Sequence, residues 1–188
     1  MELLQFQQQD CPAMYRNQIL TLMQQEWPHA FENQQICWPE VEATHPISLV
    51  LIEDHTVISH VGVPSTNIQH QGLSYKAFGL SEVMTHPSYR RQGLGMRLLR
   101  EAMVLIRQHE PDISIFTCSP ALQPFYMQGG WTPMMKTCLV GGTREKPFRS
   151  DALGIITMMQ FFSEKAQASR HLFEETDVYI ELGERKLW

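Results

Sequence analysis

Cysteine is scarce in this chain of 188 residues, and the few cysteines do not cluster. They lie far apart, without a C-x-x-C pair or a nearby histidine, at Cys11, Cys37, Cys118 and Cys138. The sequence therefore indicates neither a zinc site nor a disulfide framework, and we expect reduced thiols and no metal. Cys118 ends an apolar strand-like run, which favours a structural cysteine over a catalytic thiol.

Long apolar runs and linkers are also missing. No run reaches the ~18 residues of a membrane span, and the first four residues lack the basic start of a signal peptide. No Pro/Gly/Ser-rich stretch or internal repeat divides the chain. Since 43% of the residues are hydrophobic, the chain can bury a substantial core. We expect one domain over residues 1–188, soluble and cytoplasmic.

Positive charge is in deficit, because 15 Lys and Arg stand against 20 Asp and Glu, a formal net charge of −5. Nucleic-acid-binding domains usually present a basic face, so a nucleic-acid partner is disfavoured, whereas a small cationic substrate is compatible with this balance. The acidic residues are dense near the end of the chain, at Glu174, Glu175, Asp177, Glu181 and Glu184. They form either an ordinary solvated face or an acidic wall that attracts polyamines.

The most informative segment that is present runs from Thr85 to Met96 and contains three arginine or histidine side chains and two glycines. It separates an apolar run, predicted as a strand over Gly79–Thr85, from an amphipathic helix predicted over Gly93–His109. The first N–H groups of a helix lack intrahelical partners, and the helix dipole favours anions. Because Gly93 and Gly95 carry no side chain to hold a ligand away, the segment predicts a cradle for a pyrophosphate.

The same segment excludes two common nucleotide-binding motifs. Gly93-Leu94-Gly95 is followed neither by a third spaced glycine nor by Lys-Ser/Thr, which argues against a dinucleotide-binding domain and a P-loop. Arg90 and Arg91 add charge beside the helix start, and a guanidinium can pair with two phosphate oxygens. Taken alone, a Gly-x-Gly at a helix start is more often a tight turn than a ligand loop.

The remaining elements are predicted from local patterns. A strand near Leu3–Gln7 precedes a helix over Tyr15–Trp27, and a hairpin follows with strands Ile47–Glu53 and Thr56–Pro64. Gln71-Gly72 turns the chain into the strand that ends at Thr85, and Ile113–Cys118 is predicted to be parallel to that strand across a helical crossover. A short helix over Ser119–Met127 then leads to strands Trp131–Val140 and Leu153–Phe161.

Two short motifs in this order resemble a known family. Arg90-Arg91-Gln92-Gly93-Leu94-Gly95 matches the (Q/R)-x-x-G-x-(G/A) signature of the GCN5-related N-acetyltransferases (GNAT family), whose loop holds the coenzyme A pyrophosphate. Phe125-Tyr126-Met127-Gln128-Gly129-Gly130-Trp131 follows about where that family carries its LYxxxGF-like segment. The resemblance implies a single α/β (α+β) GNAT-type domain with a mixed, mostly antiparallel central sheet flanked by helices on both faces. It also implies acetyl-CoA as cosubstrate, and a homodimer is one expectation because dimers are frequent among related proteins.

The chemistry of amine acetylation assigns roles to particular residues. Glu82 interrupts an apolar strand just before the loop, so it is the candidate base and can also hold the ammonium; the alternative is an edge-strand glutamate that faces solvent. The resemblance implies that Tyr126 protonates the departing thiolate. It further implies that backbone N–H groups around Val83, Met84 and Thr85 bind the thioester oxygen. Coenzyme contacts are then expected at Arg90, Arg91, Gln92, Gly93, Leu94, Gly95, Met96 and Ser119, the last standing where many relatives carry an asparagine.

A closer resemblance runs along nearly the whole chain. Thr56–Val63, the placement of Glu82, the run Ser119–Trp131 and the terminal tryptophan are similar to aminoglycoside 2'-N-acetyltransferases. In those enzymes the corresponding glutamate and tyrosine are the proposed base and acid, and the terminal carboxylate contacts the cationic sugar, which implies these roles for Glu82, Tyr126 and Trp188. Those enzymes end in Asp-x-Trp, whereas this chain has Lys186-Leu187-Trp188, so either Glu184 substitutes for the aspartate or the substrate differs.

Two alternatives to an aminoglycoside acetyltransferase stay open. One is an N-acetyltransferase for another small amine or polyamine, which would share the catalytic residues but not the substrate pocket. The other is a non-catalytic sensor or partner-binding module that binds acyl-CoA through the same loop. The presence of both Glu82 and Tyr126 speaks against the sensor, because such a protein needs neither titratable group.

Overall fold

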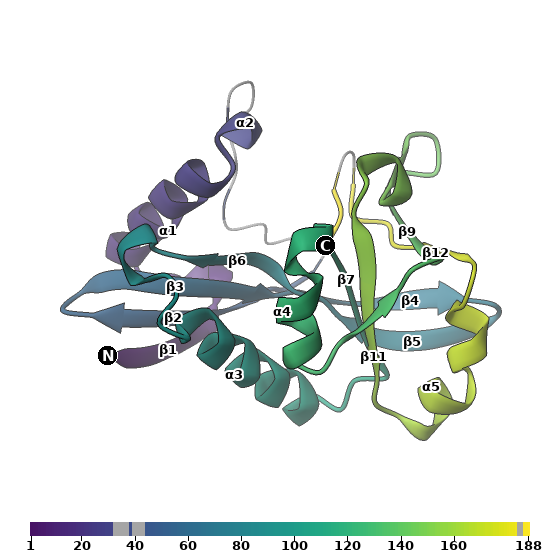
Figure 1. Cartoon of the computed structure of the whole chain (residues 1–188). Coiled ribbons are helices and arrows are strands. Elements are labelled where there is room, and N and C mark those ends of the chain that lie inside the picture. Colours follow the sequence, from purple (N-terminus) through teal and green to yellow (C-terminus); the bar gives the residue numbers. More distant parts are fainter. Residues whose placement is uncertain (32–37, 39–43, 184–185) are drawn as a thin grey trace. The chain divides into compact units, whose positions relative to one another are not determined.

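The computed structural model describes residues 1–31, 38, 44–183 and 186–188 (Figure 1). Contacts divide the chain into two compact units, each assembled from two stretches of sequence. The first unit comprises Met1–Pro64 and Leu80–Ala102, and the second comprises Ser65–Gly79 and Met103–Trp188. Most strand pairs are antiparallel, and helices accompany the sheets, which confirms the predicted α+β class. One domain over 1–188 stays a prediction.

The first unit contains a four-stranded antiparallel sheet. Its order is β1 (Glu2–Gln7), β2 (Ile47–Glu53), β3 (Thr56–Val63) and β6 (Ser81–Thr85). Asp54 and His55 form the β2–β3 turn with positive φ angles of 47° and 62°, which fits the predicted hairpin. Since β6 is the last strand in this order, one side of its backbone lies at an edge of this sheet.

Helices cover both faces of that sheet, as Figure 1 shows for α1 (Ala13–Glu26) and the beginning of α3 (Leu94–Gln108). The buried residues of α1 recur at helical spacing and pack with residues of β2, β3 and β6 in one core cluster. This cover explains why β2 is an almost continuous apolar run, since a strand buried on both faces has no polar side. A short helix, α2 (Pro28–Phe31), follows α1.

The second unit contains two sheets. The larger has the order β4 (Ser65–His70), β5 (Leu73–Phe78), β7 (Ile113–Cys118), β11 (Ile156–Phe161) and β8 (Thr132–Met134), and β5–β7 is its parallel pair. The smaller has the order β10 (Pro147–Arg149), β9 (Cys138–Gly142) and β12 (Asp177–Tyr179). Its β9–β12 pair is also parallel.

Short helical segments connect these strands. In the first unit they are the 3-10 turns η1 (Gln8–Asp10) and η2 (Pro87–Tyr89). In the second unit they are η3 (Pro120–Leu122), α4 (Gln123–Gln128), η4 (Asp151–Leu153), α5 (Glu164–Ala168) and η5 (Arg170–Phe173). The predicted helix Ser119–Met127 is therefore η3 followed by α4, with Pro120 as the first residue of η3 and Pro124 as the second residue of α4.

Three strand predictions need correction. The strand that follows the Gln71-Gly72 turn does not continue to Thr85, because β5 ends at Phe78 and β6 begins at Ser81. The strand parallel to β7 is β5, whereas β6 pairs antiparallel with β3. The strand predicted over Trp131–Val140 is two strands in two sheets, because the chain turns where the Thr137 N–H donates to the Met134 carbonyl. The last predicted strand begins at Ile156 rather than Leu153, after a turn that ends at Gly154 with a φ of 66°.

Within the described part of the chain, no helix is long and apolar enough to cross a membrane. The same residues contain no group of three or more His, Cys, Asp or Glu side chains that could hold a metal ion. Cys11, Cys118 and Cys138 are buried and free, and Cys37 lies outside the described residues. Burial raises the pKa of both the Cys11 and Cys118 thiols to about 11, so these groups are unreactive at neutral pH.

Candidate functional site

The loop before α3 has the geometry of an anion cradle. Gly93 adopts a φ of 77°, with nothing within 4 Å of the place a Cβ would occupy, and Arg91 also has a positive φ of 62°. The helix then begins at Leu94, so the N–H groups of its first turn point out of the helix end. Residues 90–93 are exposed. Donors, positive charge and open space therefore meet at the predicted position.

Arg90 is tied to two groups beside this loop. Its Nε donates to the Thr85 carbonyl at 3.0 Å, and its Nη2 lies 2.5 Å from Oε2 of Glu26 at the end of α1. The guanidinium is half exposed. The C-terminal end of a helix carries partial negative charge, so the dipole of α1 does not stabilise the Glu26 carboxylate. The ion pair with Arg90 supplies that stabilisation. A phosphate at the loop would meet an arginine already held in place.

Glu82 lies in a β-bulge of β6. The β3–β6 register jumps between the pairs His60↔Met84 and Gly62↔Ser81, so Glu82 and Val83 face one residue of β3. Glu82 has a φ of 52°, an uncommon conformation for a residue with a side chain. Its side chain is 17% exposed, and its Oε2 accepts hydrogen bonds from Gln8 and Trp38. The solvent-facing alternative is therefore wrong.

His60 secures the backbone of this bulge from β3. Its Nδ1 lies 3.0 Å from the Glu82 carbonyl oxygen, and its Nε2 lies 2.8 Å from the Ser48 hydroxyl. A carbonyl can only accept, so Nδ1 carries the proton and donates, and the Ser48 hydroxyl donates to Nε2. Burial lowers the pKa of His60 to about 4. The ring is therefore neutral at physiological pH and holds the bulge rather than shuttling protons.

The other predicted coenzyme contacts on β6 have distinct environments. The Met84 side chain is buried in the α1 core cluster, and its carbonyl accepts a hydrogen bond of 2.8 Å from the Ser59 hydroxyl. The hydroxyls of Thr85 and Ser59 lie 3.0 Å apart. The predicted role of Val83, Met84 and Thr85, binding of the thioester oxygen, is therefore left to their backbone groups. These groups lie at the edge of the first unit's sheet.

In the second unit, Tyr126 lies on α4 with its ring buried among aromatic side chains. It makes edge contacts with Phe116 and Phe125, at centroid distances of 4.9 and 5.1 Å. Burial, and then the nearby Cys118 thiol, raise the pKa of Tyr126 above its ordinary value. The phenol therefore stays protonated over the whole physiological range, as a proton donor must.

Trp188 is anchored at the point where β5 ends. A main-chain carboxylate oxygen of Trp188 accepts a 2.8 Å hydrogen bond from the Thr117 N–H and a second bond from the Thr117 hydroxyl. Its buried indole packs so closely on Gly79 that a Cβ there would lie 2.4 Å from a ring atom. The ring explains why a glycine interrupts the predicted strand. Ser119 is exposed at the start of η3, and Glu184 lies outside the described residues.

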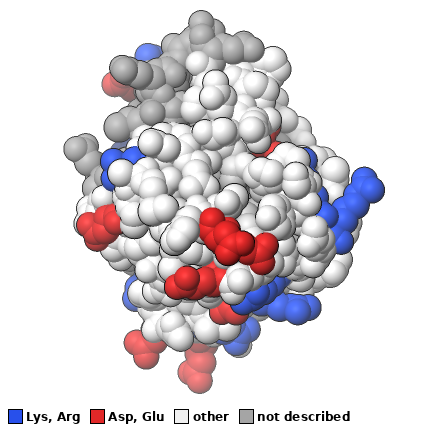
Figure 2. Space-filling model, turned by 90° about the vertical axis from the view of Figure 1, so that its left-hand side faces the viewer, with Lys and Arg blue, Asp and Glu red and all other residues white. Residues whose placement is uncertain are grey.

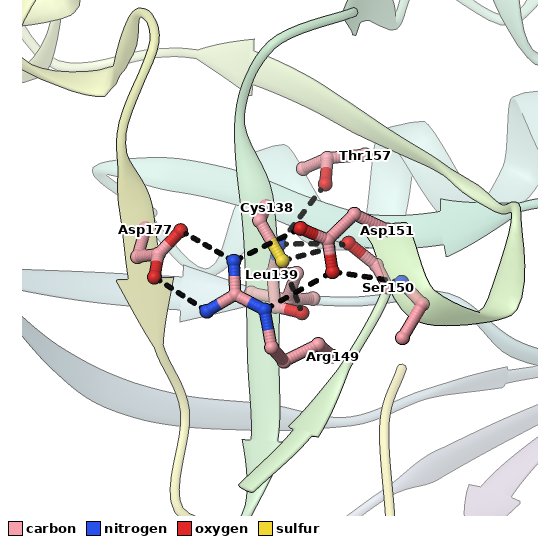
Figure 3. A network of polar contacts seen from close by, with 8 residues as sticks. Cys138, Leu139, Arg149, Ser150, Asp151, Thr157 and Asp177 are labelled. Atoms are coloured by element: carbon pink, nitrogen blue, oxygen red, sulfur yellow. Dashed lines mark hydrogen bonds and ion pairs between the residues drawn. The ribbon is translucent and has the colours of Figure 1, made fainter.

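A polar network fastens the smaller sheet of the second unit (Figure 3). Figure 3 shows the Arg149 guanidinium between Asp177 of β12 and Asp151, with two hydrogen bonds to each carboxylate of 2.6 to 3.1 Å. The guanidinium holds the pKa of Asp151 down to about 2. Arg149 also lines a cavity of about 470 Å³, together with Tyr179 and Glu181, which is the size of a small-molecule pocket.

Charged side chains are mixed on the face drawn in Figure 2. Acidic groups gather near the centre of that face, and basic groups lie mainly at its lower and right-hand side. Among the residues that the structure describes, this face therefore presents carboxylates and separate basic groups rather than one broad basic patch. Nucleic acids are bound by broad basic surfaces.

Two residues at this site have no signal in the sequence. Gln8 and Trp38 reach Glu82 from 74 and 44 positions away. Gly62 leaves the space for them, because a Cβ there would lie 3.0 Å from Gln8 Nε2 and 3.2 Å from Glu82 Oε2. A glutamine in a glutamine-rich segment and a lone tryptophan carry no spacing pattern, so only the fold reveals them. Glu82 belongs to the first unit and Tyr126 to the second, and their joint action stays a prediction.

The family is decided by a match of residues 5–134 to the model of the acetyltransferase (GNAT) domain. The chain belongs to the GNAT family. The match includes the loop, Glu82 and Tyr126. It confirms the expected family and the acyltransferase class. A comparison with curated proteins found no match.

Solved structures of GNAT proteins have the same fold at low sequence identity. ElaA of Escherichia coli is 13% identical with a TM-score of 0.63, over 85% of this chain and 98% of that one. An acyl-CoA N-acyltransferase from Pseudomonas aeruginosa is 14% identical with a TM-score of 0.62 and the same coverage. An aminoglycoside 6'-N-acetyltransferase solved with coenzyme A is 13% identical with a TM-score of 0.56, over 86% and 97%. These likenesses show the GNAT fold and leave the acceptor open.

Proposed function

We propose that this GNAT protein transfers the acetyl group of acetyl-CoA to a primary amine of a small cationic molecule, within a ternary complex. The observation that carries the proposal is the loop before α3, where Gly93 and the open N–H groups of the first turn lie beside Arg90 and Arg91. A pyrophosphate fits this combination of donors and charge. The family match supports the coenzyme.

The edge strand β6 supports the same proposal. An extended chain that carries amide groups can pair with an exposed strand edge, and the pantetheine arm of coenzyme A is such a chain. The bulge at Glu82 and Val83 leaves backbone groups of β6 outside the regular ladder with β3. N–H groups at this bulge are therefore the proposed donors to the thioester oxygen.

The reaction assigns one proton to each catalytic residue. Glu82 takes a proton from the ammonium, directly or through water, which frees the nitrogen lone pair to attack the thioester carbon. The tetrahedral oxyanion then re-forms the carbonyl as the carbon–sulfur bond breaks, and the nitrogen releases its second proton to water. Tyr126 gives its proton to the departing thiolate, which leaves as coenzyme A. Acid–base groups of this kind contribute about 10²- to 10⁴-fold each to a rate.

We infer an aminoglycoside as one candidate acceptor and another small amine or polyamine as the second. The resemblance to 2'-N-acetyltransferases and the fold shared with a 6'-N-acetyltransferase favour the first. Lys186 stands where those 2'-N-acetyltransferases carry an acid, and this departure favours a substrate other than an aminoglycoside. In either case Trp188, Glu184 and Glu82 are the proposed contacts to the acceptor.

Substitution of Gly93 tests the coenzyme site. A valine at a φ of 77° strains the loop and places methyl groups where the phosphates approach, so Gly93→Val should weaken acetyl-CoA binding more than tenfold. Isothermal titration calorimetry with acetyl-CoA measures the change. Gly72→Val is the matched control, because Gly72 has a φ of 79° and the same open surroundings at the β4–β5 turn. Equal binding by both variants would refute the proposed cradle.

A further inference from the structure

Glu82 is held by two neutral donors that both reach the same oxygen. Gln8 Nε2 and Trp38 Nε1 each lie 2.9 Å from Glu82 Oε2. Both donor residues are buried, with 1% and 6% of their surface exposed. Hydrogen bonds to the charged form of a carboxyl stabilise that form. Because the donors carry no charge, they stabilise the anion without neutralising it.

The contact with Glu82 uses only one end of the Gln8 side-chain amide. Its Oε1 is buried and has no hydrogen-bond partner among the described residues. An unpartnered buried carbonyl costs free energy, and the opposite orientation of the amide would set two oxygens against each other at Glu82. The geometry therefore indicates that the amide is retained for its Nε2–H. Gly62 preserves the space for this arrangement.

Among the described residues, the charged groups on the elements next to Glu82 make hydrogen bonds or ion pairs with other groups. From β3, His60 Nδ1 lies 3.9 Å from Oε2 but is neutral and bonded to the Glu82 carbonyl. From α1, which packs on β6, Arg16 donates to the carbonyls of Gln9 and Cys11. Glu26, at the end of the same helix, pairs with Arg90. The remaining titratable groups at the start of α1 are the Cys11 thiol and the Tyr15 phenol.

We propose that Gln8 and Trp38 are positioning residues that keep Glu82 ionised and fixed in direction, so that the site selects an acceptor arriving as an ammonium ion. This inference rests on the proposed function. It adds a source of specificity: an anion held by neutral donors attracts a cationic amine, whereas a protonated carboxyl would accept neutral groups equally well. The indole of Trp38 also makes an edge contact with His60 at a centroid distance of 5.8 Å.

The test is a direct titration of the Glu82 carboxyl. Protein labelled with ¹³C-glutamate is titrated by NMR, and the Glu82 signal is assigned with Glu82→Gln. Trp38→Phe and Gln8→Met each remove one donor with little change of shape. We expect each to raise the pKa of Glu82 by ~0.5–1 unit, since each removes a hydrogen bond to the anion. Trp27→Phe and Gln9→Met are the matched controls, because they make the same chemical changes at exposed positions.

Activity gives a second readout with spermidine and a 2'-amino aminoglycoside as acceptors. The acid limb of kcat/KM for the amine should move to higher pH in both variants, while the KM for acetyl-CoA stays unchanged. An unshifted Glu82 titration in a folded Gln8→Met or Trp38→Phe protein would overturn the inference. A raised pKa of Glu82 in these variants, in a protein that acetylates no amine, would support the role of Gln8 and Trp38 and overturn the proposed function.

Discussion

At the scale of single residues, Tyr126 is the proposed acid, and its environment matches that role. Burial keeps its phenol protonated, so Tyr126→Phe should lower kcat by about 10²-fold or more through loss of the proton donor. The KM for acetyl-CoA should change little, because the ring and its contacts with Phe116 and Phe125 are retained. Steady-state kinetics at saturating acetyl-CoA measures both quantities.

Tyr75→Phe controls for the loss of a buried hydroxyl in the same unit. Tyr75 is fully buried, and its hydroxyl has no hydrogen-bond partner among the described residues, so its removal should leave kcat unchanged. If Tyr126→Phe kept the wild-type kcat, the thiolate would take its proton from another group. Equal losses in both variants would point to packing rather than proton transfer.

The functional roles of residues that stand out in the local sequence pattern could be predicted. The roles of residues that depend on contacts with distant parts of the chain could not. Glu82 was identifiable because it interrupts an apolar strand, and Gly93 because it begins an amphipathic helix. Gln8 and Trp38 were not identifiable, since their role depends on pairing across 74 and 44 positions. His60 was visible as a histidine near the site, but its tautomer and its bond to the Glu82 carbonyl required the fold.

At the scale of elements, the β3–β6 pairing links stability to pH through His60. Its pKa falls from 6.5 to about 4 on burial, so the unfolded chain binds a proton more readily than the folded one. The stability that depends on a neutral His60 is complete above about pH 6.5 and is lost as the pH falls towards 4. This loss should amount to ~3 kcal/mol by pH 4.

Urea unfolding between pH 7.5 and 4.5 measures that loss. His60→Asn is the informative variant, because asparagine keeps an N–H for the Glu82 carbonyl and cannot ionise in this range. Its stability should vary less with pH than that of the wild type. Asp112 and Asp151 have lowered pKa values, so their contributions disappear at lower pH, below about 4. Parallel pH profiles for the two proteins would contradict the assignment.

Helices and strands with a clear hydrophobic pattern were predicted with nearly correct bounds. Bulges and breaks that depend on contacts with other parts of the chain were not predicted. The predicted helix Gly93–His109 is α3 to within one residue at each end, and strand Ile113–Cys118 is β7. The bulge in β6 and the interruption after Phe78 have no local signal, because they depend on His60 of β3 and on the indole of Trp188. The parallel partner of β7 was therefore assigned to the wrong strand.

At the scale of the whole molecule, the family and the reaction class are more strongly determined than the acceptor. The loop, the held carboxylate and the buried phenol all belong to the stretch that the GNAT model matches. The smaller sheet with its Arg149 network and the anchored Trp188 follow that stretch. Since a substrate is selected by the residues of a site and not by the fold, a shared fold with an aminoglycoside acetyltransferase does not transfer a substrate.

The most direct test of the account is thiol release from acetyl-CoA with a panel of acceptors. The panel contains aminoglycosides with and without a 2'-amine, spermidine and simple arylalkylamines, and mass spectrometry identifies the acetylated product. We expect amine-dependent release of coenzyme A with at least one cationic amine, and loss of that release in Glu82→Gln. Silence across the panel, in a protein that acetyl-CoA still stabilises against heat, would contradict an acetyltransferase for small cationic amines and favour an acyl-CoA-binding protein.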